Sequence, residues 1–297
     1  MTTAIAKPET VIARRNLLAL AGTLTAAAAV SPALAQGKST IVLERLPHGV
    51  LLIGIDRQEV QNRIDIPTYN ALGQAYHEFE HDDQLRMAVL HGKGADFSQG
   101  LDVQSWAAGL RAGPFQAPAN FLDPLGTGGP ERSKPLVVAV QDRVTRIAHE
   151  LFLAADVRVA AQDAVFNQGE VLGGAFPGGG ATVRFVREAG WGNAMRYMLS
   201  GQDWRADEAY RMGLVQEVTP SGQQLDRAVG FATQIASTTA PLGVRALLAS
   251  AHRALNEGEK AAMAALQPEF ARLLRSEDRQ EFLRALQENR APVYVGR

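Results

Sequence analysis

Two glutamates in the middle of the sequence have the setting of an acid–base pair. Glu150 falls in the first turn of a predicted helix, and Glu170 follows a short excursion of one strand out and one strand back. Such a path can return the chain to the same end of a sheet and place the two carboxylates near each other. Close carboxylates cannot both ionise easily, so one keeps a proton and can act as an acid while its partner acts as a base. The spacing therefore predicts proton transfer, although acidic residues are more often solvated surface groups.

A second arrangement suggests a different chemistry. His77, Glu78 and His81 match the H-E-x-x-H pattern in which two histidines, one helical turn apart, bind zinc in proteases. Tyr76 and Phe79 are expected to anchor the buried side of this helix, which leaves both histidines near solvent. No third ligand follows at a recognisable spacing. A zinc metalloprotease is therefore a remote alternative, and no metal site is predicted.

Strands and helices alternate around these residues. Apolar runs predict strands at 41–45, 50–55, 87–90, 136–140, 157–160 and 214–218, and helical patterns span 67–79, 148–155 and 205–212. Residues 107–135 are rich in Gly, Pro and Ala, which favours a mobile loop beside the pocket. From residue 225 to about 287 the pattern is helical, with breaks expected near Pro241 and Pro268. This order predicts an α/β fold with a helical C-terminal region and no second domain.

Short motifs then follow one another in an order that resembles the crotonase superfamily, the enoyl-CoA hydratase/isomerase fold. They are Asp56–Asn62, Asp82–Gly92, Gly94–Asp102, Lys134–Gln141, Glu150-Leu151, Ala155–Ala160, Phe166–Glu170, Pro177–Arg184 and Ala206–Val215. Each motif is weak alone, but together they cover essentially all of the chain after residue 35. The resemblance implies a crotonase-like ββα spiral. It also places Glu150 and Glu170 where hydratases carry their acid–base pair.

The same resemblance implies an oxyanion hole, in which two backbone N–H groups stabilise an enolate oxygen. These donors would be the amides of Leu101 and Ile147. The sequence departs from the family here, because Arg146, Ile147 and Ala148 stand where hydratases usually carry consecutive glycines. The added side chains are expected to crowd the approach of a thioester, and Arg146 would suit an anionic substrate.

Three further residues are candidates for substrate binding. His91 ends a predicted strand near the first oxyanion loop, and Trp106 lies beside the mobile segment, where it could line an apolar acyl pocket. By resemblance, Tyr294 belongs to the C-terminal stretch that touches the nucleotide of CoA in hydratases. Each could instead have a purely structural role. His91 could cap the end of its strand, Trp106 could close the mobile segment, and Tyr294 could pack against the final helix.

Residues 1–35 predict a cleavable export signal. Arg14 and Arg15 precede the apolar run Leu17–Val30, and Ala33–Ala35 fits a small-residue cleavage site. The paired arginines resemble the twin-arginine type, with a Sec signal or a membrane anchor as alternatives. The run is shorter than the roughly 20 residues of a spanning helix. Cleavage would remove three basic residues and one acidic residue and leave a net charge of −3 over 262 residues. We therefore expect an exported, periplasmic protein that is not held in the membrane after cleavage.

Composition restricts the partners and the chemistry. The 30 Lys+Arg and 31 Asp+Glu residues nearly balance, which argues against a nucleic-acid partner. The absence of cysteine excludes a disulfide framework, a thiolate metal site and a cysteine nucleophile. No cofactor is expected, since an acyl thioester would be the substrate. The resemblance and the long C-terminal helices imply a homotrimer or hexamer.

These observations predict a lyase (hydratase) or isomerase that acts on an enoyl-CoA through a stabilised enolate. Two alternatives keep the fold. One is a periplasmic hydrolase or lyase that splits a C–C bond in a CoA-free ketone or diketone, because an exported enzyme would not normally meet CoA. The other is a catalytically silent crotonase-like protein. The expected organisation is a signal at 1–35, an α/β core at 36–230 and a helical region of the same domain at 231–297.

Overall fold

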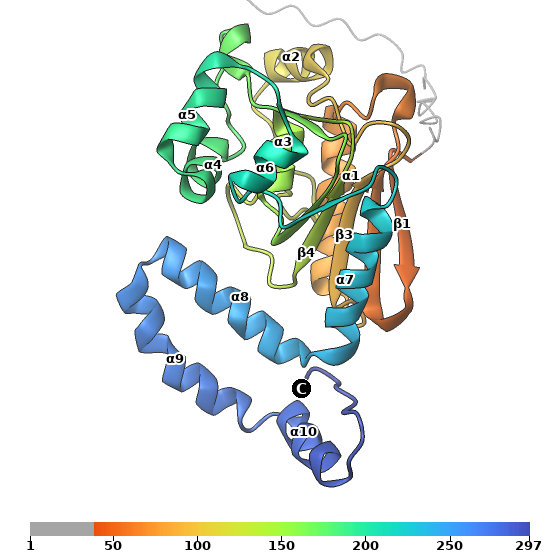
Figure 1. The fold of residues 1–297 in the computed structure, drawn as a ribbon, viewed down its shortest axis with the longest axis vertical. Coiled ribbons are helices and arrows are strands. Elements are labelled where there is room, and N and C mark those ends of the chain that lie inside the picture. The colour runs from red at the N-terminus through yellow and green to blue at the C-terminus, as the bar shows by residue number, and fades with distance from the viewer. Residues whose placement is uncertain (1–38) are drawn as a thin grey trace, which may run out of the picture. The chain divides into compact units, whose positions relative to one another are not determined.

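A six-stranded sheet forms the centre of the computed structural model, which describes residues 39–297 (Figure 1). Its strands, in spatial order, are β1 (Ile41–Leu46), β2 (Val50–Ile55), β3 (Met87–Gly92), β4 (Leu136–Val140), β6 (Val157–Ala161) and β9 (Glu217–Thr219). The first pair is antiparallel and the others are parallel. A second sheet contains β5 (Arg143–Thr145), β7 (Val165–Asn167) and β8 (Trp204–Arg205). The predicted signal peptide lies outside the described residues.

Helices cover the sheet and continue beyond it. They are α1 (Ile66–His81), α2 (Val103–Ala112), α3 (Ile147–Leu153), α4 (Ala181–Ala189), α5 (Trp191–Ser200), α6 (Ala206–Arg211), α7 (Gln224–Thr238), α8 (Pro241–Asn256), α9 (Glu259–Leu273) and α10 (Glu277–Gln287). Short 3-10 turns occur at η1 (Pro47–Gly49), η2 (Gln58–Val60) and η3 (Glu170–Gly173). Residues 38–297 form one unit. The α/β class with a helical C-terminal region, predicted from the sequence, is confirmed.

Alternating side chains of the central strands divide the core into two layers. In β2, Leu51 and Ile53 join the larger apolar cluster with α1 and α3, whereas Val50 and Leu52 face the opposite layer. That second layer is covered by α7, whose alanines at 228, 232 and 236 recur every four residues and form one narrow stripe. Because alanine is small, the helix can lie close to the strands, as Figure 1 shows beside β3 and β4.

Two expectations about helix boundaries are wrong. Helix α9 runs through Pro268 without ending there, and the chain breaks instead at Gly258, before α9, and at Ser276, after it. Residues 103–112 form α2, whose N-cap Asp102 accepts a hydrogen bond from the amide of Ser105. The Gly- and Pro-rich sequence therefore loses regular structure only after residue 112. Of the helices at residues 39–297, none is long and apolar enough to cross a membrane.

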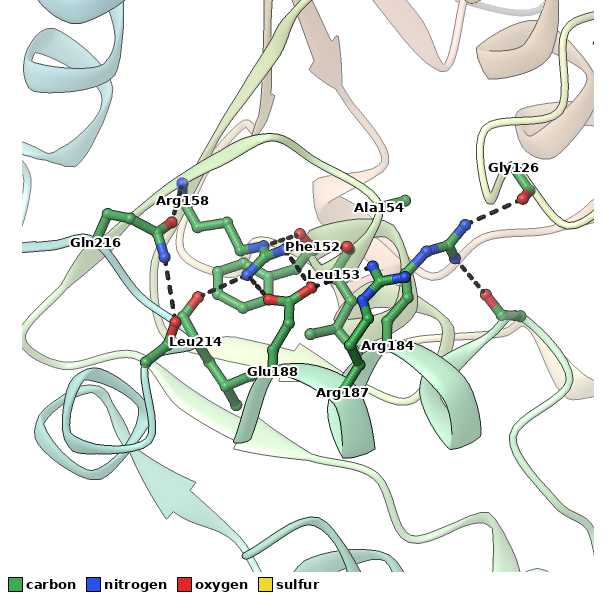
Figure 2. A network of polar contacts seen from close by, with 12 residues as sticks. Gly126, Phe152, Leu153, Ala154, Arg158, Arg184, Arg187, Glu188, Leu214 and Gln216 are labelled. Carbon is green, nitrogen blue, oxygen red and sulfur yellow. Dashed lines mark hydrogen bonds and ion pairs between the residues drawn. The ribbon is translucent and has the colours of Figure 1, made fainter. Parts of the chain in front are cut away.

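A buried arginine fastens α3 to α4 (Figure 2). The guanidinium of Arg158 donates to the carbonyl oxygens of Phe152 at 2.9 Å, Leu153 at 3.2 Å and Leu214 at 3.2 Å. It also forms an ion pair with Glu188 on α4. The last carbonyls of a helix have no partner within the helix, so Arg158 satisfies those of α3 and fixes the helix against its neighbour.

Replacement of this arginine tests the contribution of the clamp to stability. In Arg158→Met, the α3 carbonyls and Glu188 lose their donor while buried, so we expect the free energy of unfolding to fall by about 3 kcal/mol or more. Urea unfolding followed by circular dichroism measures the loss. Arg227→Met removes an exposed ion pair with Glu217 and should cost less than about 1 kcal/mol. Equal losses in the two variants would contradict the clamp.

Candidate active site

The two loops predicted to supply the oxyanion hole lie against each other. The amide of Ser98 donates to Arg143 O at 2.9 Å, and the amide of Thr145 donates back to Ser98 O at 3.2 Å. Gly100 has a φ of +88°, and a Cβ at this position would lie 2.7 Å from Thr145 O. Only glycine permits this close approach. The loop that carries Leu101 is thereby held beside the start of α3.

Both predicted amide donors are directed away from backbone acceptors. In the parallel bridge between Ile64 and Leu101, the amide of Ile64 donates to Gly100 O and the amide of Asp102 donates to Ile64 O. The N–H of Leu101 points to the other side of this ladder. Ile147 is the first residue of α3, where an N–H has no acceptor within the helix. Such groups can bind a negative oxygen.

Arg146 takes a backbone conformation that normally belongs to glycine. Its φ of 55° and ψ of −114° lie outside the regions that residues with a Cβ prefer. The conformation is fixed from both sides, because the amide of Arg146 donates to Asn167 O at 2.8 Å and its carbonyl accepts from the Glu150 amide at 3.0 Å. Its Nε is buried without a hydrogen-bond partner. Strain of this kind costs about 1–3 kcal/mol and is common at functional sites.

The neighbouring Ile147 does not form an exposed obstruction. Its side chain is 7% exposed and belongs to the apolar cluster around α3. The core therefore accommodates the bulk that replaces a glycine here. The Ile147 side chain is therefore part of the core and not of the exposed surface.

Glu150 is buried and held by backbone amides. Its side chain lies on α3, the residue is 3% exposed, and Oε1 accepts from the amides of Gly179 at 2.7 Å and Ala181 at 3.1 Å. A Cβ on Gly179 would lie 2.6 Å from Oε2, so a larger residue would displace the carboxylate. The pKa of Glu150 is raised to about 7, chiefly by burial and also by the charge of Glu170, against the opposing effect of the two amides.

Glu170 begins η3 and faces the same region. Its Oε1 accepts from Nε2 of Gln168 at 2.8 Å, while its Oε2 is buried without a partner. Burial raises the pKa of Glu170, and the Arg146 guanidinium and the Gln168 amide oppose this rise. The structure thus brings the two glutamates into electrostatic contact. The charge of Glu170 contributes to the raised pKa of Glu150, so ionisation of one carboxylate disfavours ionisation of the other.

An aromatic cluster borders this region. Its rings are Tyr69, Trp106, Phe115 and Phe121, with centroids 5.6 to 6.1 Å apart. Trp106 Nε1 donates to Ile64 O at 3.0 Å, and the Tyr69 hydroxyl donates to Asp123 at 2.6 Å. Asp123 in turn accepts from the amides of Leu125 and Thr127, which orders the loop after the cluster. Trp106 therefore lies in an apolar wall beside the oxyanion loops.

The ordered loop is attached to α4, the helix whose start donates hydrogen bonds to the Glu150 carboxylate. Arg184 on α4 donates to Gly179 O at 3.2 Å. It also donates to Gly126 O at 3.0 Å, as Figure 2 shows. Leu125 also comes close to Gly179, since a Cβ on that glycine would lie 3.0 Å from the leucine side chain. The start of α4 therefore contacts both the loop beside the aromatic cluster and the carboxylate of Glu150.

Two predicted binding residues lie elsewhere in this chain. His91 alternates with the β3 residues that face the larger cluster, and its ring lies against Gly54, 2.9 Å from where a Cβ would be. It therefore faces the α7 side of the sheet, where burial lowers its pKa. Tyr294 lines a cavity of about 840 Å³ with Arg86, at the start of β3 and at the opposite end of the strand from the oxyanion loops. Neither side chain joins the glutamates.

The H-E-x-x-H pattern does not gather a metal site. The rings of His77 and His81 stack at 3.9 Å on the surface of α1, and Glu78 is paired with Arg45 at 2.9 Å. Within residues 39–297, no three His, Cys, Asp or Glu side chains are grouped so that they could hold a metal ion. The geometry gives the metalloprotease alternative no third ligand.

Several site residues were not found from the sequence. Gln168, Gly179 and Arg184 stand inside motifs that carry the family resemblance, so a closer reading of those motifs could have marked them. Tyr69 and Asp123 have no such signal. They meet only because the chain folds a segment 54 residues away onto α1.

The raised pKa of Glu150 predicts a stability that depends on pH. The folded chain, with a pKa of about 7 at this residue, binds the proton more tightly than an unfolded chain with the ordinary value of 4.5. Stability contributed by this proton is present at low pH and is lost as pH rises from about 4.5 through 7. In Glu150→Gln, which cannot ionise, the stability relative to the unchanged protein should grow by on the order of 3 kcal/mol between pH 4.5 and pH 8. Urea titrations at the two pH values measure this difference. A constant difference would show that Glu150 is not desolvated.

Comparisons with known proteins agree with this geometry. A sequence model of the family described as Enoyl-CoA hydratase/isomerase matches residues 45–297. Enoyl-CoA hydratase EchA19 of Mycobacterium tuberculosis is 30% identical over 267 residues, which cover 86% of this chain and 96% of that protein. Carnitinyl-CoA dehydratase of Salmonella typhi is 31% identical over 84% of this chain and 95% of its own length.

Solved structures show the same fold. The crystal structure of a probable enoyl-CoA hydratase/isomerase from Mycobacterium abscessus matches with a TM-score of 0.84 and 42% identity, covering 87% of this chain and 99% of that one. The enoyl-CoA hydratase from Mycobacterium tuberculosis H37Rv matches with a TM-score of 0.79 and 27% identity, covering 88% and 100%. The expected crotonase fold is therefore confirmed, and the chain belongs to the enoyl-CoA hydratase/isomerase family of the crotonase superfamily.

Proposed function

We propose that the protein hydrates or isomerises an enoyl-CoA thioester, with Glu150 and Glu170 as its proton-transfer pair. The observation that carries the proposal is the buried pair itself. Two carboxylates with raised pKa values lie beside two loops whose amides at Leu101 and Ile147 have no backbone acceptor. Perturbed acids next to preorganised N–H donors are the parts that enolate chemistry needs.

A hydration balances its protons when one carboxylate of the pair is ionised and the other is protonated. The thioester carbonyl would accept hydrogen bonds from the two amides, which stabilise negative charge on its oxygen. The ionised carboxylate takes a proton from water as the hydroxyl adds to Cβ, and the protonated carboxylate gives its proton to Cα. One proton is taken and one is given, so the pair ends with the same total. Isomerisation would use one carboxylate to remove a proton and return it at another carbon.

Arg146 and the aromatic wall would help to select the substrate. Arg146 opposes the rise in the pKa of Glu170 and keeps a buried, unpartnered Nε, so it can attract an anionic group. Trp106 stands with Tyr69 and Phe115 in a wall suited to an apolar acyl chain. His91 and Tyr294 have no role in this proposal, because within one chain both lie away from the glutamates.

The CoA-free alternatives receive less support. The packing of Ile147 into the core supports room for a thioester beside its amide. The relatives named above are described as acting on CoA compounds. A silent protein is disfavoured because a buried Glu150 with a pKa near 7 is a burden on stability that only a function would retain.

A turnover assay with crotonyl-CoA tests the proposed function. We expect hydration by the mature chain that begins at Gln36, and a loss of kcat of about 10²–10⁴-fold in both Glu150→Gln and Glu170→Gln, because each removes a proton-transfer group. Glu217→Gln, which alters an exposed ion pair, is the matched control and should keep full activity.

The same variants separate the alternatives. Turnover of acetylacetone without any turnover of CoA esters would replace the proposal with the C–C hydrolase. Full activity in both glutamine variants would reject the acid–base assignment, whatever the substrate.

We further propose that the chain is exported after cleavage behind Ala35 and forms a homotrimer or hexamer. Support for assembly comes from large apolar side chains that are exposed along α8, α9 and α10. They include Leu247, Met263, Phe270 and Leu286, which are 57–67% exposed. Exposed large apolar side chains on three successive helices favour an interaction surface, and copies of the same chain are the natural cover.

Light scattering on a sizing column measures the assembly. We expect a mass of three or six mature chains, and a shift to the monomer when Phe270 and Leu286 are both changed to Asp, because charges would be buried at the contact. Glu259→Gln, on the same helical region, should leave the mass unchanged. A monomeric unchanged protein would contradict the proposal.

A further inference from the structure

A fully buried histidine stands directly behind the proposed acid–base pair. His149 is 0% exposed and adjoins Glu150 on α3. Four aromatic rings surround its imidazole, those of Phe152, Phe166, Phe185 and Trp204, with centroids 5.1 to 6.0 Å away. Nothing in the proposed reaction uses this residue, yet a buried imidazole needs hydrogen-bond partners to offset its lost hydration.

The partner of His149 is the amide of Gln168. Nδ1 of the histidine lies within hydrogen-bond distance of Oε1 of Gln168, and Nε2 of Gln168 donates to Oε1 of Glu170 at 2.8 Å. These contacts form a chain of three side chains, His149, Gln168 and Glu170. Gln168 is itself fully buried, so solvent cannot replace either contact.

While Glu170 is ionised, donor and acceptor chemistry fixes the direction of each hydrogen bond from His149 through Gln168 to Glu170. The Glu170 oxygen that faces Gln168 accepts, so the amide must turn its NH₂ group toward the glutamate. Its carbonyl oxygen then faces the histidine, and an amide oxygen can only accept. Nδ1 of His149 must therefore carry the proton, and Nε2 must be the bare nitrogen. Nε2 has no hydrogen-bond partner in the aromatic cage, which suits the nitrogen without a proton.

The two oxygens of Glu170 differ in their hydrogen bonding. Oε1 is occupied by the Gln168 amide, whereas Oε2 is buried and free. Oε2 is thus the oxygen left to take or give a proton. If the Gln168 amide were turned over, its carbonyl oxygen would face the ionised Glu170 Oε1 and repel it, and the carboxylate would leave this orientation.

We propose that His149 is a positioning residue, which as the neutral Nδ1–H tautomer locks the Gln168 amide so that Glu170 presents Oε2 to the substrate. This role rests on the proposed function of Glu170. His149 touches neither substrate nor reacting atoms, and it is not the proton donor.

The charged groups around the chain are compatible with a neutral imidazole. Burial lowers the pKa of His149 to about 3, the contact with Gln168 opposes this, and the nearby Arg158 lowers it further. Glu170 is faced by Arg146 from the start of α3 and by Glu150 from the same helix. His149 therefore stays neutral across the pH range in which the glutamate pair exchanges its proton.

Nitrogen NMR of the mature protein tests the tautomer without any substrate. With ¹⁵N-labelled histidine, we expect one imidazole to show a protonated Nδ1 and a bare Nε2 at every pH from 5 to 9, and to vanish in His149→Asn. An Nε2–H tautomer, or a signal that titrates in this range, would overturn the proposal.

Two variants separate positioning from packing. Asn places an N–H donor where Nδ1 stands, whereas Leu fills the space without a donor. We expect His149→Leu to lower kcat with crotonyl-CoA by about 10- to 100-fold with little change in KM. We also expect it to raise the pKa of Glu170, read from ¹³C-labelled glutamate carboxyls, while His149→Asn restores most of both. Trp204→Phe changes one of the four rings around His149 but none of the hydrogen bonds that join His149, Gln168 and Glu170. It should leave kcat and the pKa of Glu170 unchanged.

The outcomes distinguish this role from the proposed function. Equal losses in the Asn and Leu variants, with an unmoved Glu170 pKa, would show that His149 only fills space. If crotonyl-CoA is not turned over at all, the proposed function fails, and the tautomer and the carboxyl titration still decide the role of His149.

Discussion

The removal of two carboxylates from water is the constraint around which this structure is organised. Burial raises the pKa of both Glu150 and Glu170, and the charge of Glu170 contributes to the rise at Glu150. A buried charge must be met by hydrogen-bond donors or neutralised by a proton. The fold supplies hydrogen-bond donors to both glutamates. Backbone amides at Gly179 and Ala181 donate to Glu150, and the side-chain amide of Gln168 donates to Glu170.

The rest of the architecture keeps those donors in place. Arg158 satisfies the end of α3 and ties it to Glu188 on α4, while Arg184 ties the start of α4 to the loop at Gly126. The helix that carries Glu150 is therefore anchored at its end, and the segment that receives the carboxylate is anchored at its beginning. Small shifts in either would expose a carboxylate or leave an amide without a partner, and both changes cost free energy.

Much of the fold could be predicted because it depends on local patterns. The hairpin, the buried strands and the first helix follow from apolar alternation or a period near 3.6, which reports one buried face. Pro268 shows the limit of that approach. Proline usually ends a helix, but α9 continues through it. His91 shows another limit, because a residue at a strand end is known to be near a loop, while its face of the sheet depends on the register.

The sequence by itself determined the fold class, the order of the motifs and the identity of the two glutamates, because residue type and spacing are properties of the chain alone. Only the tertiary structure decided what surrounds them. The contact of Tyr69 with Asp123, the burial of Ile147 and the chain from His149 to Glu170 join residues on different elements. Desolvation and hydrogen bonding are set by neighbours in space, so they appear only when those elements come together.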